Sequence, residues 1–134
     1  MQTNLEDYIL HNSHVIAVVG LSPNPDRPSH EVAHHLQEKG FRIIPVNPTA
    51  KEILGEVSYP DLTAIPEKVD VVDIFRRSED VPPIVEQAIK IGAKTVWMQE
   101  GVINDDAALL ARQAGLNVVM DRCIWKEYRR LHGA

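Results

Sequence analysis

VIAVVGLSPNPDRPSHEVAHHLQEKGFRIIPVN, residues 15–47, contains a strand, a helix and a second strand, and this unit decides the fold class. The run 15–20 is apolar and ends in glycine, as expected of a central strand that is buried on both faces. Residues 29–39 have a helical pattern with Ser29 as the expected N-cap, and Gly40 ends it. Residues 41–47 read as a second strand, so the unit predicts two parallel strands joined by a helix.

The same alternation continues to the end of the chain. Apolar runs predict further strands at 69–75, 95–101 and 116–120. Helical patterns surround them: 3–12 with Thr3 as a candidate cap, 79–92 with Ser78 as a cap and its prolines in the first turn, 104–115, and 121–133. The stretch 48–66 has weak periodicity and is expected to hold at most one short edge strand within 55–66.

Strands that alternate with helices are typical of a parallel sheet with helices on both faces. We therefore predict a single α/β domain over residues 1–134, a Rossmann-like doubly wound sheet of five or six strands. Ligands of such sheets bind outside the carboxyl ends of the strands, where the strand order reverses. The loops that follow Val19, Val46, Phe75 and Met98 are therefore the expected site.

Composition excludes several classes of partner. The net charge is −5, from 14 basic and 19 acidic residues, which gives no basic surface for nucleic acid. The single cysteine cannot form an internal disulfide, and the acidic N-terminal segment does not resemble a signal peptide. No apolar stretch approaches the roughly 20 residues of a membrane span. We expect a cytoplasmic protein that contacts neither nucleic acid nor membrane.

HEVAH, residues 30–34, matches the H-E-x-x-H pattern of zinc proteases. On a helical wheel Val32, Ala33 and Leu36 form the core-facing stripe, and the two histidines project away from it. The extended form of the motif needs Gly and His at positions that Gln37 and Gly40 occupy here. A distant carboxylate, Glu52 or Glu56, remains open as a third ligand, but we predict no metal site.

The loop after the first strand suits an anion instead. Gly20 allows close approach of a backbone, Ser22 adds a hydroxyl, and Arg27 adds a forked, permanently charged donor. The first amides of the next helix are unsatisfied and lie at the positive end of its dipole. A pyrophosphate fits this description. The alternative is that Gly20 only makes a turn and Arg27 is a solubilising charge.

The second strand ends without the acid that reads the ribose in nicotinamide enzymes. Asn47 and Pro48 stand there, and Lys51 follows three residues later. This pattern favours a ligand with an extra phosphate near its ribose. NADP and coenzyme A both meet that condition.

Three segments together resemble the small stand-alone CoA-binding domain proteins: residues 18–48 and 72–102 with the motif DRCI at 121–124. The domain is also similar to the N-terminal, CoA-binding part of the succinyl-CoA synthetase α subunit. The resemblance implies CoA or acyl-CoA as ligand. By position it implies a diphosphate site made by Gly20, Leu21, Ser22, Arg27, Pro28 and Ser29, and an adenosine and 3′-phosphate site made by Val46, Asn47, Pro48 and Lys51. At the end of the third strand, Phe75 is expected either to contact adenine or to pack in the core, and Arg76 and Arg77 to reach phosphate. Met98, Gln99 and Gly101 are the implied pantetheine site.

No arrangement of residues demands catalysis. The synthetase uses a phosphorylatable histidine in a further domain, and the six histidines here have no nucleophile or acid at a diagnostic spacing. The sequence therefore favours a non-catalytic carrier, sensor or regulator; an NADP-dependent oxidoreductase or another nucleotide-binding enzyme is the alternative.

Two features of the last helix stay open. Cys123 is expected either to form a mixed disulfide with CoA or to be a buried structural cysteine. Trp125 and Tyr128 mark either a homodimer surface or the packing of this helix on its own sheet.

Overall fold

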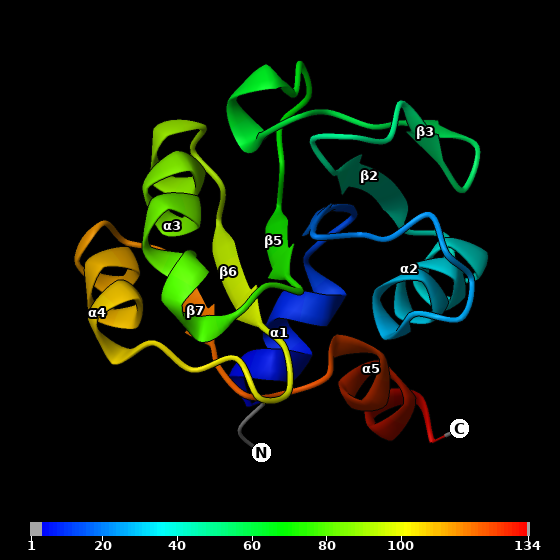
Figure 1. Ribbon diagram of the computed structural model, residues 1–134. Helices are drawn as coiled ribbons and strands as arrows, with labels where there is room; N and C mark the ends of the chain where they lie inside the picture. The colour runs from blue at the N-terminus through cyan, green and yellow to red at the C-terminus, as the bar shows by residue number, and fades with distance from the viewer. Residues whose placement is uncertain (1–3, 134) are drawn as a thin grey trace.

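Five parallel strands form the centre of the computed structural model, which describes residues 4–133 (Figure 1). Their order across the sheet is β2-β1-β5-β6-β7. The bounds are β1 (Val15–Val19), β2 (Arg42–Val46), β5 (Val71–Ile74), β6 (Thr95–Met98) and β7 (Asn117–Val119). These are the five strands that the apolar runs predict, each one to three residues shorter. The predicted doubly wound α/β fold is therefore confirmed.

Helices cover both faces of the sheet (Figure 1). One face carries α1 (Leu5–His11), α2 (Pro28–Glu38) and α5 (Ile124–His132), whose buried side chains join one apolar cluster. The other carries α3 (Val81–Lys90) and α4 (Asp105–Gln113), which belong to a second cluster. Side chains alternate along a strand, so each central strand supplies both clusters: Val18 lies in the first and Val19 in the second.

Three residues, Thr3, Ser29 and Ser78, are expected to cap helices. Thr3 lies outside the described residues, and Asn4 caps α1 by accepting a hydrogen bond from the amide of Asp7. The prediction that Ser29 caps α2 is wrong, because Arg27 holds the N-cap position and Pro28 is the first helical residue. Ser78 does not cap α3 either. It starts a 3₁₀ turn, η2 (Ser78–Asp80), and its Oγ accepts from the amide of Ile103, 3.0 Å away.

The weakly periodic stretch 48–66 does not add a strand to the main sheet. It forms a hairpin of β3 (Glu52–Ile53) and β4 (Glu56–Val57), then a 3₁₀ turn η1 (Leu62–Ala64). The two central residues of the hairpin turn both have positive φ, as a type I′ turn requires: 55° at Leu54 and 75° at Gly55. The expected edge strand is therefore corrected to a separate two-stranded sheet.

The strand order reverses between β1 and β5, and this switch point determines where a ligand can bind. Beyond the last paired residues the amide of Phe75 still donates to the carbonyl of Val19, at 2.8 Å. The chain then turns away in opposite directions, toward α2 after β1 and toward α3 after β5. A crevice opens between these two loops.

None of the helices in the described part of the chain is long and apolar enough to cross a bilayer. Trp125 and Tyr128 are half-buried rather than exposed, and both pack against the cluster beneath α2 and α5. The Trp125 ring stacks on His35 of α2 at a centroid distance of 4.6 Å. Packing within the chain accounts for these side chains.

Candidate functional site

The loop between β1 and α2 is held in shape by short-range hydrogen bonds. The amide of Ser22 donates to Oγ of Ser29 at 3.0 Å, and Oγ of Ser22 accepts from the amide of Asn24 at 3.1 Å. Nδ1 of His30 lies 2.9 Å from the carbonyl oxygen of Ser22. Ser29 is therefore a buried anchor of the loop, which explains why it is polar without being the helix cap.

The amino end of α2 remains open to an anion. Pro28 has no N–H, and the amide of Ser29 donates to no acceptor in the described chain. Arg27 is exposed and makes no ion pair with any described residue. A pocket of about 380 Å³ lies here, and its lining comprises Gly20, Ser22, Arg27, Pro28, Ser29 and Phe75. A free guanidinium, a free amide and the positive end of a helix thus converge on one cavity.

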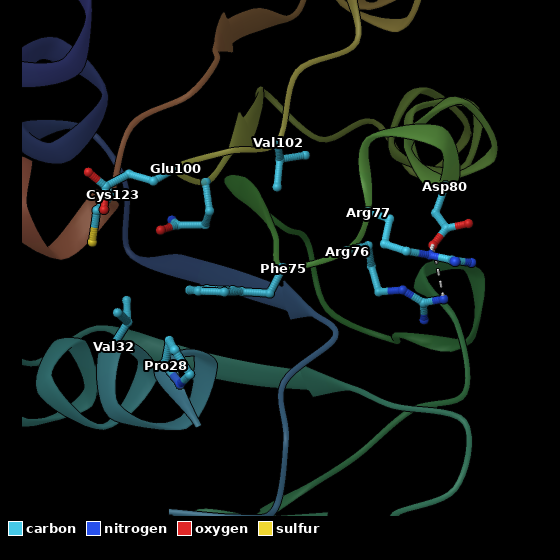
Figure 2. A pocket seen from close by; sticks show the side chains of 10 residues that line it. Pro28, Val32, Phe75, Arg76, Arg77, Asp80, Glu100, Val102 and Cys123 are labelled. Atoms are coloured by element: carbon cyan, nitrogen blue, oxygen red, sulfur yellow. Dashed lines mark hydrogen bonds and ion pairs between the residues drawn. The ribbon is translucent and has the colours of Figure 1, made fainter. Parts of the chain in front are cut away.

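A larger pocket of about 590 Å³ adjoins it and shares Pro28 and Phe75. Figure 2 shows α2 side chains along one wall, the arginines after β5 at one end and Cys123 at the other. The lining residues are Pro28, Val32, Phe75, Arg76, Arg77, Asp80, Gln99, Glu100, Val102 and Cys123. The ring of Phe75 is half-buried and lies across the floor between the two ends.

The cavity continues along the carboxyl edge of the sheet. A pocket of about 330 Å³ shares Arg76 and Asp80 with the large one and reaches Val46, Pro48 and Pro60. A fourth, of about 450 Å³, shares both prolines and extends to Lys51 on the hairpin side. These shared walls make one elongated crevice, and we call the four pockets together the crevice.

Asn47 fixes two sides of the crevice relative to each other. Its Nδ2 donates to the carbonyl of Leu21 at 3.0 Å, and its Oδ1 accepts from the amides of Thr49 at 2.8 Å and Ala50 at 3.0 Å. The nitrogen and the oxygen of the side-chain amide therefore both have hydrogen-bond partners within the protein. The side chain that replaces the ribose-binding acid therefore joins two loops and orients Pro48 and Lys51.

The arginines after β5 differ from Arg27 because they have anionic partners. Arg76 and Arg77 lie 3.5 Å and 3.3 Å from Oδ2 of Asp80. The hydrogen bond from Arg77 holds the pKa of the Asp80 carboxyl below its usual range. An anion in this part of the crevice competes with Asp80. Arg27 and Lys51, which pair with no acid among the described residues, are therefore the more available cations.

A buried polar pair lies beneath the large pocket. Nε2 of Gln99 donates to Oδ1 of Asp73 at 2.6 Å, and Asp73 is fully buried in the centre of β5. Oδ2 of Asp73 has no hydrogen-bond partner among the described residues. Burial raises the pKa of Asp73 to about 7, and the hydrogen bond from Gln99 opposes that shift. Sequence reasoning missed this pair, although an acid inside an apolar strand was visible as a signal in VVDIF.

Cys123 is half-buried at the N-cap of α5 and lines the same pocket as Gln99. Burial raises the pKa of its thiol, while the backbone amides of Lys126 and Trp125 oppose the shift. The negative charges of Asp73 and Glu100 raise it further. The thiol is therefore mostly protonated at neutral pH.

The remaining residues implied by the resemblance occupy different environments. The side chains of Leu21, Val46 and Met98 are buried in the core, and of the three only Val46 belongs to the lining of a crevice pocket. Gly101 is exposed, and its amide donates to Oδ1 of Asp121 at 2.7 Å. It lies in the turn after β6, outside the lining of the crevice pockets.

The two H-E-x-x-H histidines have different surroundings, and neither belongs to the lining of the crevice pockets. His34 is exposed as predicted, whereas His30 is half-buried and bound to the loop. Glu56, one of the carboxylates left open as a third ligand, pairs with Arg42. Within residues 4–133, no three His, Cys, Asp or Glu side chains are grouped so as to hold a metal.

A family model described as the CoA binding domain matches residues 14–129 of the chain. The chain is 44% identical over 116 residues to a Bacillus subtilis protein named "Uncharacterized protein YneT", covering 87% of this chain and 86% of that protein. A hypothetical protein from Pyrococcus horikoshii OT3 has a solved structure that matches with a TM-score of 0.92 and 39% identity, covering 99% of each chain.

A second kind of relative is much longer. The chain is 28% identical over 120 residues to acetate–CoA ligase (ADP-forming) I of Archaeoglobus fulgidus, covering 82% of this chain. It spans only 18% of that ligase. The same fold thus matches both small proteins over most of their length and one segment of a large enzyme.

Proposed function

The chain belongs to the CoA binding domain family, and from this premise we propose that it binds coenzyme A or an acyl-CoA along the crevice. The observation that carries the proposal is the cavity where the unpaired Arg27, the free amide of Ser29 and the amino end of α2 meet in the described part of the chain. A diphosphate placed there receives charged and neutral donors without displacing any internal partner.

The rest of CoA extends from this cavity in two directions. Toward the hairpin, Pro48 offers an apolar surface beside the adenosine, and Lys51 offers an ammonium to the 3′-phosphate. Toward β6, the large pocket accepts the pantetheine arm over Phe75 and next to Gln99. The crevice therefore accommodates a long ligand with anionic groups near its middle and one end.

We propose that the domain carries or senses its ligand rather than transforming it. No histidine lines the crevice pockets in the described part of the chain. The hydroxyls of Ser22 and Ser29 already accept backbone hydrogen bonds, and no histidine or carboxylate of the described residues is hydrogen-bonded to either; the nearby His30 contacts the carbonyl of Ser22 instead. A carrier needs only to bind its ligand at such a site, and a sensor needs only a change in the loops when the ligand binds.

Replacing Arg27 with alanine is expected to weaken CoA binding by about 1.5 to 3 kcal/mol, the value of one hydrogen bond to a charged group. That loss is roughly a tenfold to hundredfold increase in Kd, measured by isothermal titration calorimetry. Arg112→Ala serves as a matched control, because Arg112 is an exposed arginine on α4, away from the crevice. Unchanged affinity in Arg27→Ala would contradict the diphosphate placement. Binding of NADP but not of CoA by the wild type would replace CoA with a nicotinamide ligand.

The Lys51→Ala variant tests the adenosine end separately. We expect it to weaken binding of CoA but to leave binding of dephospho-CoA unchanged, because dephospho-CoA lacks the 3′-phosphate that Lys51 is proposed to contact. The exposed ammonium should contribute about 1 kcal/mol or less. Calorimetric titrations of both ligands at low salt measure the difference. An equal loss for the two ligands would place Lys51 elsewhere on the ligand.

A further inference from the structure

The far end of the large pocket holds the only cysteine of the chain. In Figure 2, Cys123 and Glu100 lie at the end opposite Arg76 and Arg77, with the Phe75 ring between. A ligand that places its diphosphate near Arg27 and runs over Phe75 therefore ends close to the Cys123 thiol. The reactive end of CoA is itself a thiol or a derivative of that thiol.

A second observation at this end of the pocket is the buried carboxyl of Asp73. Its position in β5 is two residues before Phe75, so both side chains lie on the same face of the sheet. Through Gln99, the carboxyl is joined to the pocket lining, and its charge acts on the thiol of Cys123. A fully buried carboxyl oxygen without a partner is costly in a folded protein. The unpartnered oxygen therefore lies beneath the pocket lining, on the side of the sheet that also carries Phe75 and Cys123.

We infer that this end of the crevice is a thiol-exchange site, where Cys123 reacts with a bound CoA disulfide and becomes a mixed disulfide with one CoA. The inference rests on the proposed CoA binding. The Cys123 thiolate attacks one sulfur of the CoA disulfide, a new S–S bond forms, and the old S–S bond breaks. One CoA leaves as its thiolate and takes up the proton that Cys123 released. Cys123 is oxidised and half of the CoA disulfide is reduced, so no other oxidant is needed.

The surroundings of the thiol set the pH dependence of this reaction. Asp73 from β5 and Glu100 after β6 disfavour the thiolate, and Lys126 on α5 opposes them. The α2 wall of the pocket contributes only Pro28 and Val32, which carry no charge. The thiolate is the attacking species, so the exchange rate should increase with pH across the neutral range. Exchange at neutral pH therefore depends on binding, which holds the disulfide next to a weakly ionised thiol.

The test uses the wild-type chain and intact-mass measurement. Incubation with CoA disulfide should add the mass of one CoA less two hydrogen atoms, and with a single cysteine in the chain the adduct can only be on Cys123. Glutathione disulfide at the same concentration is the comparison. We expect CoA disulfide to react about tenfold faster or more, because binding raises its local concentration. Adenosine 3′,5′-bisphosphate, which lacks sulfur, should slow the CoA disulfide reaction and leave the glutathione disulfide reaction unchanged.

The unfolded chain in denaturant provides the reference for intrinsic reactivity, and there the two disulfides should react at similar rates. Equal rates with the folded protein, or no adduct although calorimetry shows CoA binding, would overturn the exchange site and leave the proposed function standing. Absence of CoA binding in calorimetry would overturn both. The two failures are therefore distinguishable.

Discussion

Asp73→Asn is expected to stabilise the protein at alkaline pH and to lose that advantage in acid. Burial raises the pKa of Asp73 to about 7 from the ordinary value of 3.8. Between these two values the unfolded chain has released its proton and the folded chain has kept it, so the stability of the wild type falls as pH rises. Asparagine does not titrate. The free energy of unfolding of the variant, relative to that of the wild type, should therefore increase by up to about 4 kcal/mol from about pH 4 to about pH 8.

Urea unfolding of both proteins across this pH range measures the effect. Asp70→Asn is the matched control of opposite sign. Burial raises the pKa of Asp70, but hydrogen bonds from the amides of Val15 and His14 and the nearby Lys94 outweigh it, so the pKa lies below its usual range. A lowered pKa contributes stability that is present at neutral pH and lost on acidification. The control should be less stable than the wild type at neutral pH. A constant difference between Asp73→Asn and the wild type at all pH values would contradict a raised pKa.

The acid at position 73 lowers the stability of the protein, and this points to a functional role. A buried carboxyl with one unpaired oxygen lowers stability above neutral pH, and an apolar residue in β5 would avoid that cost. Functional sites are where such costs are commonly found. Asp73 lies below Gln99, at the end of the crevice proposed for the CoA sulfur. A role in that site would explain why a destabilising acid is present in β5.

Most of the fold could be predicted because each central strand is buried on both faces. Such strands are continuous apolar runs, and in this chain the runs VIAVV and TVWM correspond directly to β1 and β6. The loops at the carboxyl ends follow from the parallel order alone. Hence the crevice was predictable from periodicity without knowledge of any contact.

The errors came from interactions that are not local in sequence. Ser78 looks like a helix cap, but its hydroxyl binds the loop after β6, 25 residues away. The hairpin at 52–57 has leucine where a type I′ turn usually has asparagine, so its turn signal was weak. The sequence also did not reveal that the amide of Asn47, which lines the crevice, binds Leu21 and Thr49. Sequence patterns indicate which loops form a site but do not assign the hydrogen bonds within them.

Gly20→Ala is expected to destabilise the protein by roughly 2 to 6 kcal/mol, from backbone strain and overpacking together. Gly20 has φ of 88°, where side chains other than glycine are strained. A Cβ at this position would also collide with the carbonyl oxygen of Phe75, because the loops after β1 and β5 touch at the switch point. The glycine is therefore required by the meeting of two backbones, in addition to any closeness to a ligand.

Gly55→Ala separates the two contributions. Gly55 has φ of 75° in the hairpin, and no atom lies within 4 Å of the point that a Cβ would occupy, so it should show strain without collision. The Gly20 variant should therefore lose roughly 1 to 3 kcal/mol more than the Gly55 variant in thermal or urea unfolding. The carbonyl of Phe75 belongs to backbone already paired between β1 and β5, so it has little freedom to move away. Equal losses in the two variants would mean that the switch point is looser than the structure shows, and the cavity bounded by Gly20 and Phe75, which we propose for the diphosphate, would then lack a fixed shape.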